Sequence, residues 1–132
     1  MKKVDHIGIA VRNLDDVLPY YTETLGCPLL KIEEVESERV RVAFIDAGNI
    51  KLELLEPMDD SSAIHKFLEK KGEGIHHIAF GVENIEQRMD ELKEKGVRLL
   101  NEQPKQGAGG ALVAFMHPKS SNGVLYELCQ KQ

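Results

Sequence analysis

An internal repeat limits the folds open to this chain more than any other feature of its sequence. The segment VDHIGIAV at residues 4–11 returns, with changes, within GEGIHHIAF at residues 72–80. Aligning His77 with His6 also aligns the apolar residues that follow each histidine. Each copy has strand-like apolar character, and a histidine inside a strand is unusual without a use for it.

A second pair of segments extends the repeat to the end of each half. NIKLELLEP at residues 49–57 matches GVLYELCQ at residues 123–130, and this alignment places Glu53 on Glu127. Both glutamates are flanked by apolar residues. Each half therefore has a histidine near its first strand and a glutamate in its last strand.

Helix signals follow each histidine strand. Asn13 and Asn84 are typical helix N-caps, and Gly26 and Gly96 stand where the two helices are expected to end. Three strand-like segments follow each helix; in the second half they are VRLLNEQ, ALVAFMHP and NGVLYELCQ. The Gly-rich segment 104–111 lacks the strand and helix of a nucleotide-phosphate loop, so we expect a flexible lid or substrate loop.

These elements predict an α+β protein built from two tandem βαβββ modules. We expect one domain of 132 residues, with module 1 at 1–57, a linker helix at 58–73 and module 2 at 74–132. The two modules are expected to form one curved, mixed sheet that encloses a cleft.

Composition narrows the functional classes. The formal charge of −5 argues against a nucleic-acid surface, and no apolar run approaches the ~20 residues that span a bilayer. Cys27 and Cys129 are far apart in sequence, which is typical of a reducing cytoplasm rather than a disulfide scaffold.

The repeated polar residues indicate a metal site. A buried ionised carboxylate is costly unless it is paired or binds a metal. We expect His6, Glu53, His77 and Glu127 to converge on one divalent ion of intermediate hardness, namely Co, Mn, Ni, Zn or Fe. Four protein ligands on an octahedral ion leave two positions for substrate oxygens.

Other polar and aromatic residues have simpler interpretations. His76 faces away from His77 in an alternating strand and is expected to be structural. His65 is expected at the surface, and His117 is equally open to turn chemistry and substrate contact. Glu56 is expected at the rim of the site, and Tyr20 and Tyr21 are expected to pack the first helix onto its sheet.

Several motifs resemble the vicinal oxygen chelate superfamily, which includes glyoxalase I, bleomycin-resistance proteins, extradiol dioxygenases and methylmalonyl-CoA epimerases. DHIGIAV and KLELLEP are typical of the superfamily as a whole. GEGIHHIAFGV, the loop at 104–110 and FMHPKSSNGVLYEL at 115–128 resemble the epimerases most closely. The resemblance covers nearly the whole chain and implies a glyoxalase-like fold.

The resemblance also implies a chemistry. It implies a metal held by His6, His77 and Glu127 with Glu53 as fourth ligand, proton abstraction from C2 of methylmalonyl-CoA, and an enolate stabilised by the metal. Glu127 is expected to serve as a base as well as a ligand. The implied partner is an acyl-CoA, and a homodimer is expected.

One residue departs from the family pattern. Many bacterial epimerases have a glutamate, thought to be a base, where this chain has Val42. Glu38 shares the expected strand face but lies roughly 13 Å away at ~3.3 Å per residue. The second base therefore has no assignment from the sequence.

Three other functions compete with the epimerase. A glyoxalase I-like lactoylglutathione lyase would use the same ligands on a glutathione hemithioacetal. A dioxygenase is disfavoured because its usual His-His-Glu set leaves Glu53 unexplained. A non-catalytic small-molecule binder would need no metal ligands, whereas this sequence has four.

Overall fold

The computed structural model describes residues 3–132. The contacts between residues divide the chain into two compact units. The N-terminal unit is His6–His76. The C-terminal unit is His77–Gln132 together with the chain as far as Asp5. The single-domain assignment and its module boundaries stay predictions.

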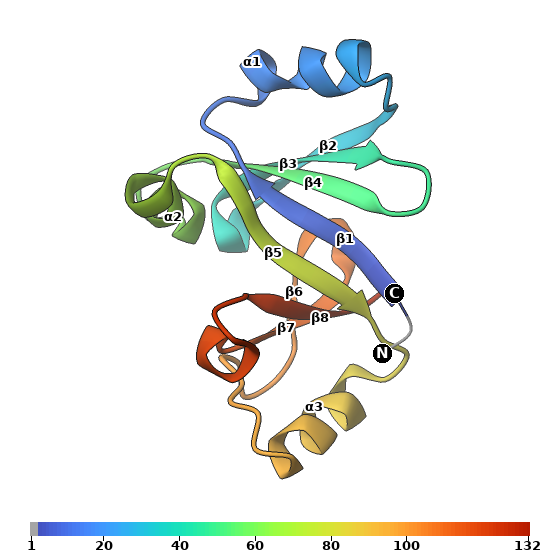
Figure 1. Cartoon of the computed structure of the whole chain (residues 1–132), viewed down its shortest axis with the longest axis vertical. Coiled ribbons are helices and arrows are strands. Elements are labelled where there is room, and N and C mark those ends of the chain that lie inside the picture. The colour runs from blue at the N-terminus through green and yellow to red at the C-terminus, as the bar shows by residue number, and fades with distance from the viewer. Residues whose placement is uncertain (1–2) are drawn as a thin grey trace. The chain divides into compact units, whose positions relative to one another are not determined.

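The N-terminal unit contains one half of the repeat and the helix that follows it (Figure 1). Its strand order is β2-β3-β4-β1, in which β1 and β4 are parallel and the other neighbours antiparallel. The elements are β1 (Lys3–Ala10), α1 (Leu14–Pro19), β2 (Leu29–Val35), β3 (Val40–Asp46), β4 (Lys51–Pro57) and α2 (Ala63–Lys71).

The first helix begins and ends as the sequence predicts, but its second half is irregular. The side chain of Asn13 accepts a hydrogen bond from the amide of Asp16, as expected of an N-cap. Beyond Pro19 the backbone continues as a π-helical turn, Tyr20–Thr24. Tyr21 packs against the core of this unit, whereas Tyr20 is 55% exposed. The predicted packing of Tyr20 onto the sheet is therefore wrong, because the wider turn directs its ring outward against the edge of Tyr21.

A helix, α2, forms within the segment that was expected to link the modules. Ser62 caps α2 by accepting from the amide of Ile64, and Ile64 and Leu68 are buried on one face. Figure 1 shows α2 in olive green beyond the end of the strands.

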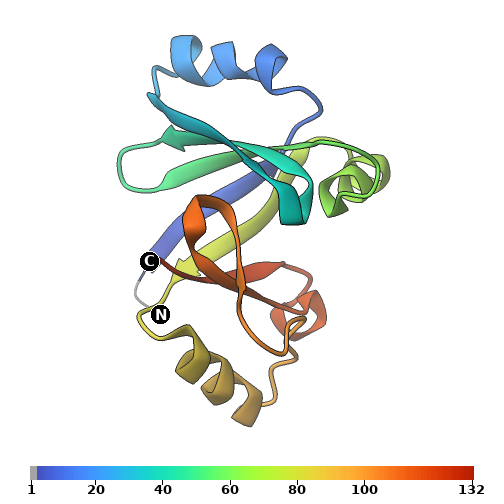
Figure 2. The same cartoon turned by 180° about the vertical axis from the view of Figure 1, so that it is seen from behind.

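The C-terminal unit repeats the βαβββ order. Its strands follow the order β5-β8-β7-β6, with β5 and β8 parallel. The elements are β5 (Gly74–Gly81), α3 (Ile85–Glu94), β6 (Lys105–Gln106), β7 (Leu112–Met116) and β8 (Tyr126–Gln130). Helix α3 buries Ile85, Met89 and Leu92 against β7 and β8. Figure 2 shows the ribbon of the chain from behind.

One predicted strand is misplaced. Residues 97–103 form only an isolated bridge, from Leu99 to Met116, and β6 lies instead inside the Gly-rich segment expected to be a loop. Gly107 approaches Val113 so closely that a Cβ at Gly107 would lie 3.1 Å from the valine side chain. A glycine at this position therefore lets the segment pair with β7, which propensity alone does not reveal.

The structure reproduces the repeat at the level of strand register. Glu53 lies opposite Gly8 in the β1–β4 pair, and Glu127 lies opposite Ala79 in the β5–β8 pair. Gly8 and Ala79 occupy equivalent positions two residues after each histidine. The small side chains leave room beside the glutamates.

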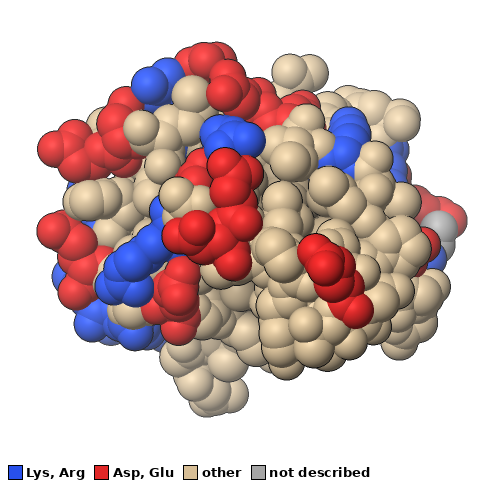
Figure 3. Space-filling model, turned by 90° about the horizontal axis from the view of Figure 1, so that it is seen from above, with Lys and Arg blue, Asp and Glu red and all other residues tan. Residues whose placement is uncertain are grey.

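On the face seen in Figure 3, acidic and basic groups gather mainly on the left, and much of the right side is uncharged. Among the described residues, the helices are too short and too polar for any of them to cross a membrane.

Candidate metal centre

His6 and Glu53 form a buried pair within the N-terminal unit. The Nδ1 atom of His6 lies 3.2 Å from a carboxylate oxygen of Glu53. The residues are 3% and 6% exposed, although both are polar. Strand alternation explains the burial of His6, which shares a strand face with the small residues Gly8 and Ala10.

His77 and Glu127 form the matching pair within the C-terminal unit. The Nε2 atom of His77 lies 3.7 Å from a carboxylate oxygen of Glu127, and both residues are buried. Two buried pairs at equivalent positions of the repeat are difficult to explain as accidents of packing, because burial of each carboxylate is costly.

The geometry of each pair fits ligands of one metal ion. Two neighbouring ligands that each bind an ion at about 2.1 Å are about 3 Å apart. The nitrogen–oxygen distances of 3.2 Å and 3.7 Å are close to this value. Imidazole nitrogen and carboxylate oxygen are also donors that suit the divalent ions predicted from the sequence.

An aromatic ring and a lysine accompany each pair. Phe44 lies opposite Glu53 in the β3–β4 ladder, and Phe115 lies opposite Glu127 in the β7–β8 ladder. The edge of the Phe115 ring meets His77, with 5.6 Å between ring centroids. These phenylalanines therefore form apolar walls next to the polar pairs.

Each half of the repeat also has a lysine above its phenylalanine. The ammonium of Lys31 lies 5.1 Å from the centroid of Phe44, and that of Lys105 lies 5.9 Å from the centroid of Phe115. Sequence reasoning missed these residues. The tripeptide VAF, which occurs at residues 42–44 and again at 113–115, was a signal that could have found the two rings.

The remaining histidines have structural partners. His76 packs edge-to-face on Phe67, and burial, aided by the nearby Lys71, lowers the pKa of His76 to about 4. His65 lies 3.5 Å from Glu69, one helical turn away. The Nδ1 atom of His117 accepts a hydrogen bond from the amide of Lys119, so the structure favours turn chemistry for this residue.

Glu56 stabilises the fold and is not a rim residue of the site, contrary to the expectation from the sequence. Its carboxylate accepts from the amide of Leu14, the first residue of α1, at 3.0 Å and pairs with Arg41 at 3.0 Å. Gln130, at the equivalent position of the second module, accepts from the amide of Ile85 in the same way, at 2.8 Å. Each last strand therefore holds the start of the helix of its own module.

The position of the missing family glutamate is apolar here. Val42 is 1% exposed and carries no acid–base group. Glu38 is not in the strand, as the sequence suggested, but in the 3₁₀ turn Glu36–Glu38. The left-handed backbone of Arg39 ends this turn and delays the start of β3.

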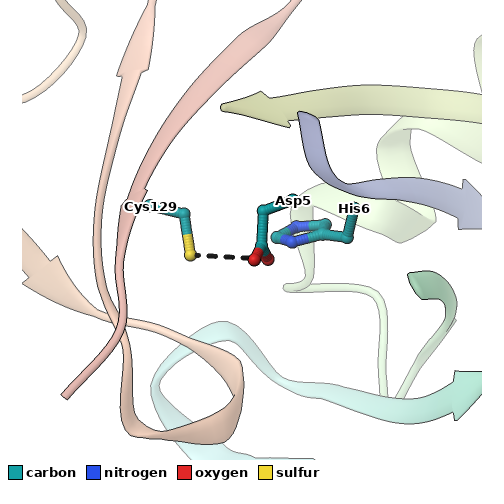
Figure 4. Close-up of side chains that lie close together, drawn as sticks. All are labelled: Asp5, His6 and Cys129. Carbon is teal, nitrogen blue, oxygen red and sulfur yellow. Dashed lines mark hydrogen bonds between the residues drawn. The ribbon is translucent and has the colours of Figure 1, made fainter. Parts of the chain in front are cut away.

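Cys129 and Asp5 meet in the C-terminal unit (Figure 4). The thiol of Cys129 lies 3.9 Å from one carboxylate oxygen of Asp5, and Lys131 lies 3.1 Å from the other. Cys129 and Cys27 are both free thiols. This contact joins the beginning of β1 to β8 and so ties both ends of the chain to one unit.

Comparison with known proteins identifies the family. A family model described as the glyoxalase/bleomycin resistance protein/dioxygenase superfamily matches residues 5–115. The chain is 46% identical over 130 residues to the uncharacterized protein YqjC of Bacillus subtilis, which covers 98% of this chain and 93% of that protein. It is 43% identical over 130 residues to the ethylmalonyl-CoA/methylmalonyl-CoA epimerase of Cereibacter sphaeroides, with 97% of each chain covered.

A solved structure agrees with these relatives. A variant of the Streptomyces coelicolor methylmalonyl-CoA epimerase in complex with 2-nitronate-propionyl-CoA matches with a TM-score of 0.93 at 39% identity, covering 99% of this chain and 98% of that one. The predicted α+β, glyoxalase-like fold is thereby confirmed. The chain belongs to the glyoxalase/bleomycin resistance protein/dioxygenase superfamily.

Proposed function

We propose that this protein is a metal-dependent epimerase that interconverts the C2 epimers of methylmalonyl-CoA. The observation that carries the proposal is the pair of buried His–Glu couples at equivalent positions of the repeat, His6 with Glu53 and His77 with Glu127. Relatives that are epimerases support the choice of reaction. The complex of the Streptomyces coelicolor enzyme with an acyl-CoA analogue supports the choice of substrate.

The proposed ligands of one divalent ion are His6, Glu53, His77 and Glu127. Either couple alone gives an ion only two donors, which is too few for a stable site, so the proposal combines both. A bound ion would supply Lewis acidity to the thioester and carboxylate oxygens of the substrate. Co, Mn, Ni, Zn and Fe all suit this donor set.

The residues of the chain would then bind, shield and deprotonate the substrate. The Phe44 and Phe115 rings, opposite Glu53 and Glu127 in their ladders, would keep water from the couples and so strengthen electrostatic interactions there. Glu127 is the proposed base that removes the C2 proton, since its carboxylate lies beside His77 and is buried.

Proton exchange at C2 tests this proposal. Purified protein in heavy water, given methylmalonyl-CoA and either Co or Mn, should incorporate deuterium at C2 and invert the configuration there. A chelator should abolish both, and added ion should restore them. A control with the same ions and no protein measures any exchange that the metal alone catalyses.

The same preparation distinguishes the competing lyase. Methylglyoxal with glutathione supplies the hemithioacetal that a glyoxalase I-like lactoylglutathione lyase would use. Formation of lactoylglutathione without exchange at C2 of methylmalonyl-CoA would replace the epimerase by the lyase. Failure of both reactions would favour a small-molecule binder of the same fold.

Two further features belong to the proposal. We propose a homodimer, which sedimentation of the purified chain would test. We also propose a cytoplasmic location, which the two free thiols, Cys27 and Cys129, support because disulfides are rare in that compartment.

A further inference from the structure

Inversion at C2 needs proton transfer on two faces of the same carbon. A C2–H bond breaks on one face as a base takes the proton, and a new C2–H bond forms on the other face as an acid supplies one. Glu127 accounts for one face in the proposed function, on which this inference rests. A second acid–base group is required unless Glu127 serves both faces.

Strand β2 presents Ile32 and Glu33 to opposite faces of the N-terminal sheet. Ile32 lies opposite Ala43, a core residue, so Ile32 is on the face that packs against α1. Glu33 is the next residue and therefore points to the other face, where its side chain is 33% exposed.

The register of the strands shows which residues share the face of Glu33. Glu33 lies directly opposite Val42 in the β2–β3 pair. Val42 shares a strand face with Phe44, two residues along, and Phe44 lies opposite Glu53. Glu33 is therefore on the same face of the N-terminal sheet as the His6–Glu53 couple.

Glu33 is also next to the position where related enzymes carry a glutamate. Directly opposed residues in an antiparallel pair have Cβ atoms about 4.5–5.5 Å apart. Glu33 thus brings a carboxylate to within one side-chain length of the apolar Val42, from the neighbouring strand. Lys31 lies on this face too, with its ammonium 3.9 Å from the Glu33 carboxylate and above the ring of Phe44.

Other carboxylates of this unit are less suitable. Asp46 is on the same face of β3, but its side chain accepts from the amide of Gly48 at 2.7 Å and so shapes a turn. Glu56 is on the opposite face and holds α1. Glu34 follows Glu33 but alternates to the opposite face and is exposed.

We propose that Glu33 is the second acid–base group of the epimerase. In one direction Glu127 takes the C2 proton and the carboxylic acid form of Glu33 returns one to the other face. In the reverse direction the two residues exchange roles. In this chain the carboxylate is on β2 instead of β3, and Val42 occupies the position of the family glutamate.

The matched variants Glu33→Gln and Glu34→Gln test this assignment, because they remove equal charge from adjacent residues on opposite faces. Each epimer of methylmalonyl-CoA is incubated separately with the metal-loaded protein in heavy water, and inversion and deuterium uptake are followed together. In Glu33→Gln, inversion should fall about 100-fold or more, the range typical of a lost acid–base group. Uptake without inversion should persist from the epimer that Glu127 deprotonates, and Glu34→Gln should behave as the wild type.

The outcomes separate the inference from the function on which it rests. Wild-type inversion by Glu33→Gln would overturn the role of Glu33 and leave the epimerase intact. Loss of bound metal from Glu33→Gln, with an equal loss of deuterium uptake from both epimers, would also overturn the role of Glu33. Glu33 would then maintain the structure of the site and not transfer a proton. If the wild-type protein neither takes up deuterium at C2 nor inverts C2, the proposed function is refuted, and Glu33 then has no reaction to serve. If Glu33→Gln does not fold, Glu33→Asp keeps a carboxylate and should retain a rate between those of wild type and a full loss.

Discussion

The two imidazoles present different ring nitrogens to their carboxylates. His6 uses Nδ1 towards Glu53, and His77 uses Nε2 towards Glu127. The two nitrogens of an imidazole differ in what each can donate or bind, so the choice sets which atom is available to a metal. The repeat therefore conserves residue type and position but not side-chain orientation.

Metal content should distinguish the two neighbouring histidines. We expect His77→Ala to lose most of the bound divalent ion, because a ligand is removed from a site with few others. His76→Ala should keep the ion, because His76 packs on Phe67 of α2 and not on the couples. Elemental analysis of both purified variants after loading with Co checks this. Loss of metal from His76→Ala alone would mean that the ligand register is shifted by one residue.

Removal of the Glu127 charge should affect the rate of C2 exchange and the metal content to different extents. Glu127→Gln retains the shape of the side chain but loses the proton acceptor. If the residue is both ligand and base, the rate of C2 exchange should fall by about 10²–10⁴ while metal content falls less. Parallel measurement of exchange rate and bound metal checks this. A rate that falls only in proportion to metal content would reduce Glu127 to a ligand.

Among the elements, each helix is joined to the strand that carries its glutamate. Glu56 and Gln130 follow Glu53 and Glu127 by three residues, and each accepts from the first amide of the helix in its own module. These side chains satisfy amides that would otherwise lack a partner at a helix start. The helix start follows the histidine strand directly, so this bond also links the His and Glu strands.

Removal of this acceptor should destabilise the N-terminal unit. Glu56→Leu loses a hydrogen bond to a charged group and leaves Arg41 without this partner, so we expect a loss of about 1.5–3 kcal/mol of unfolding free energy. Glu56→Gln keeps an acceptor oxygen and should cost less. Urea unfolding of both variants checks the order, and equal losses would mean that the charge of Glu56 matters more than its acceptor oxygen.

At the scale of the whole molecule, the proposed ligands are divided equally between the two compact units. The N-terminal unit holds His6 and Glu53, and the C-terminal unit holds His77 and Glu127. An ion bound by all four would raise the free energy of unfolding of the complete chain, because the unfolded chain has no preformed site.

Metal binding should therefore stabilise the entire chain. Free Co at 100 times its dissociation constant should add about 2.7 kcal/mol to the unfolding free energy. Thermal unfolding with Co and with a chelator measures the shift in Tm. His77→Ala, which retains only one intact couple, should show a much smaller shift. An equal shift in that variant would mean that the ion binds elsewhere.

Much of the local structure follows from the sequence because its causes are local. Asn13, Asn84 and Ser62 cap helices through their own side chains, and the strand alternation that buries His6 and His77 operates over two residues. The missed features have non-local causes. Strand β6 forms because Gly107 can approach Val113, and the exposed ring of Tyr20 follows from a π-helical turn after Pro19.

The sequence by itself determined the repeat, the βαβββ order and the residues of both His–Glu couples, because two copies of one segment have equivalent residues at equivalent spacings. Only the tertiary structure decided which groups lie beside them. Phe44, Phe115 and Glu33 reach their places through the pairing of strands that are separate in the chain. Register between strands depends on packing across the sheet, and a shift of one residue would turn each of these side chains to the other face.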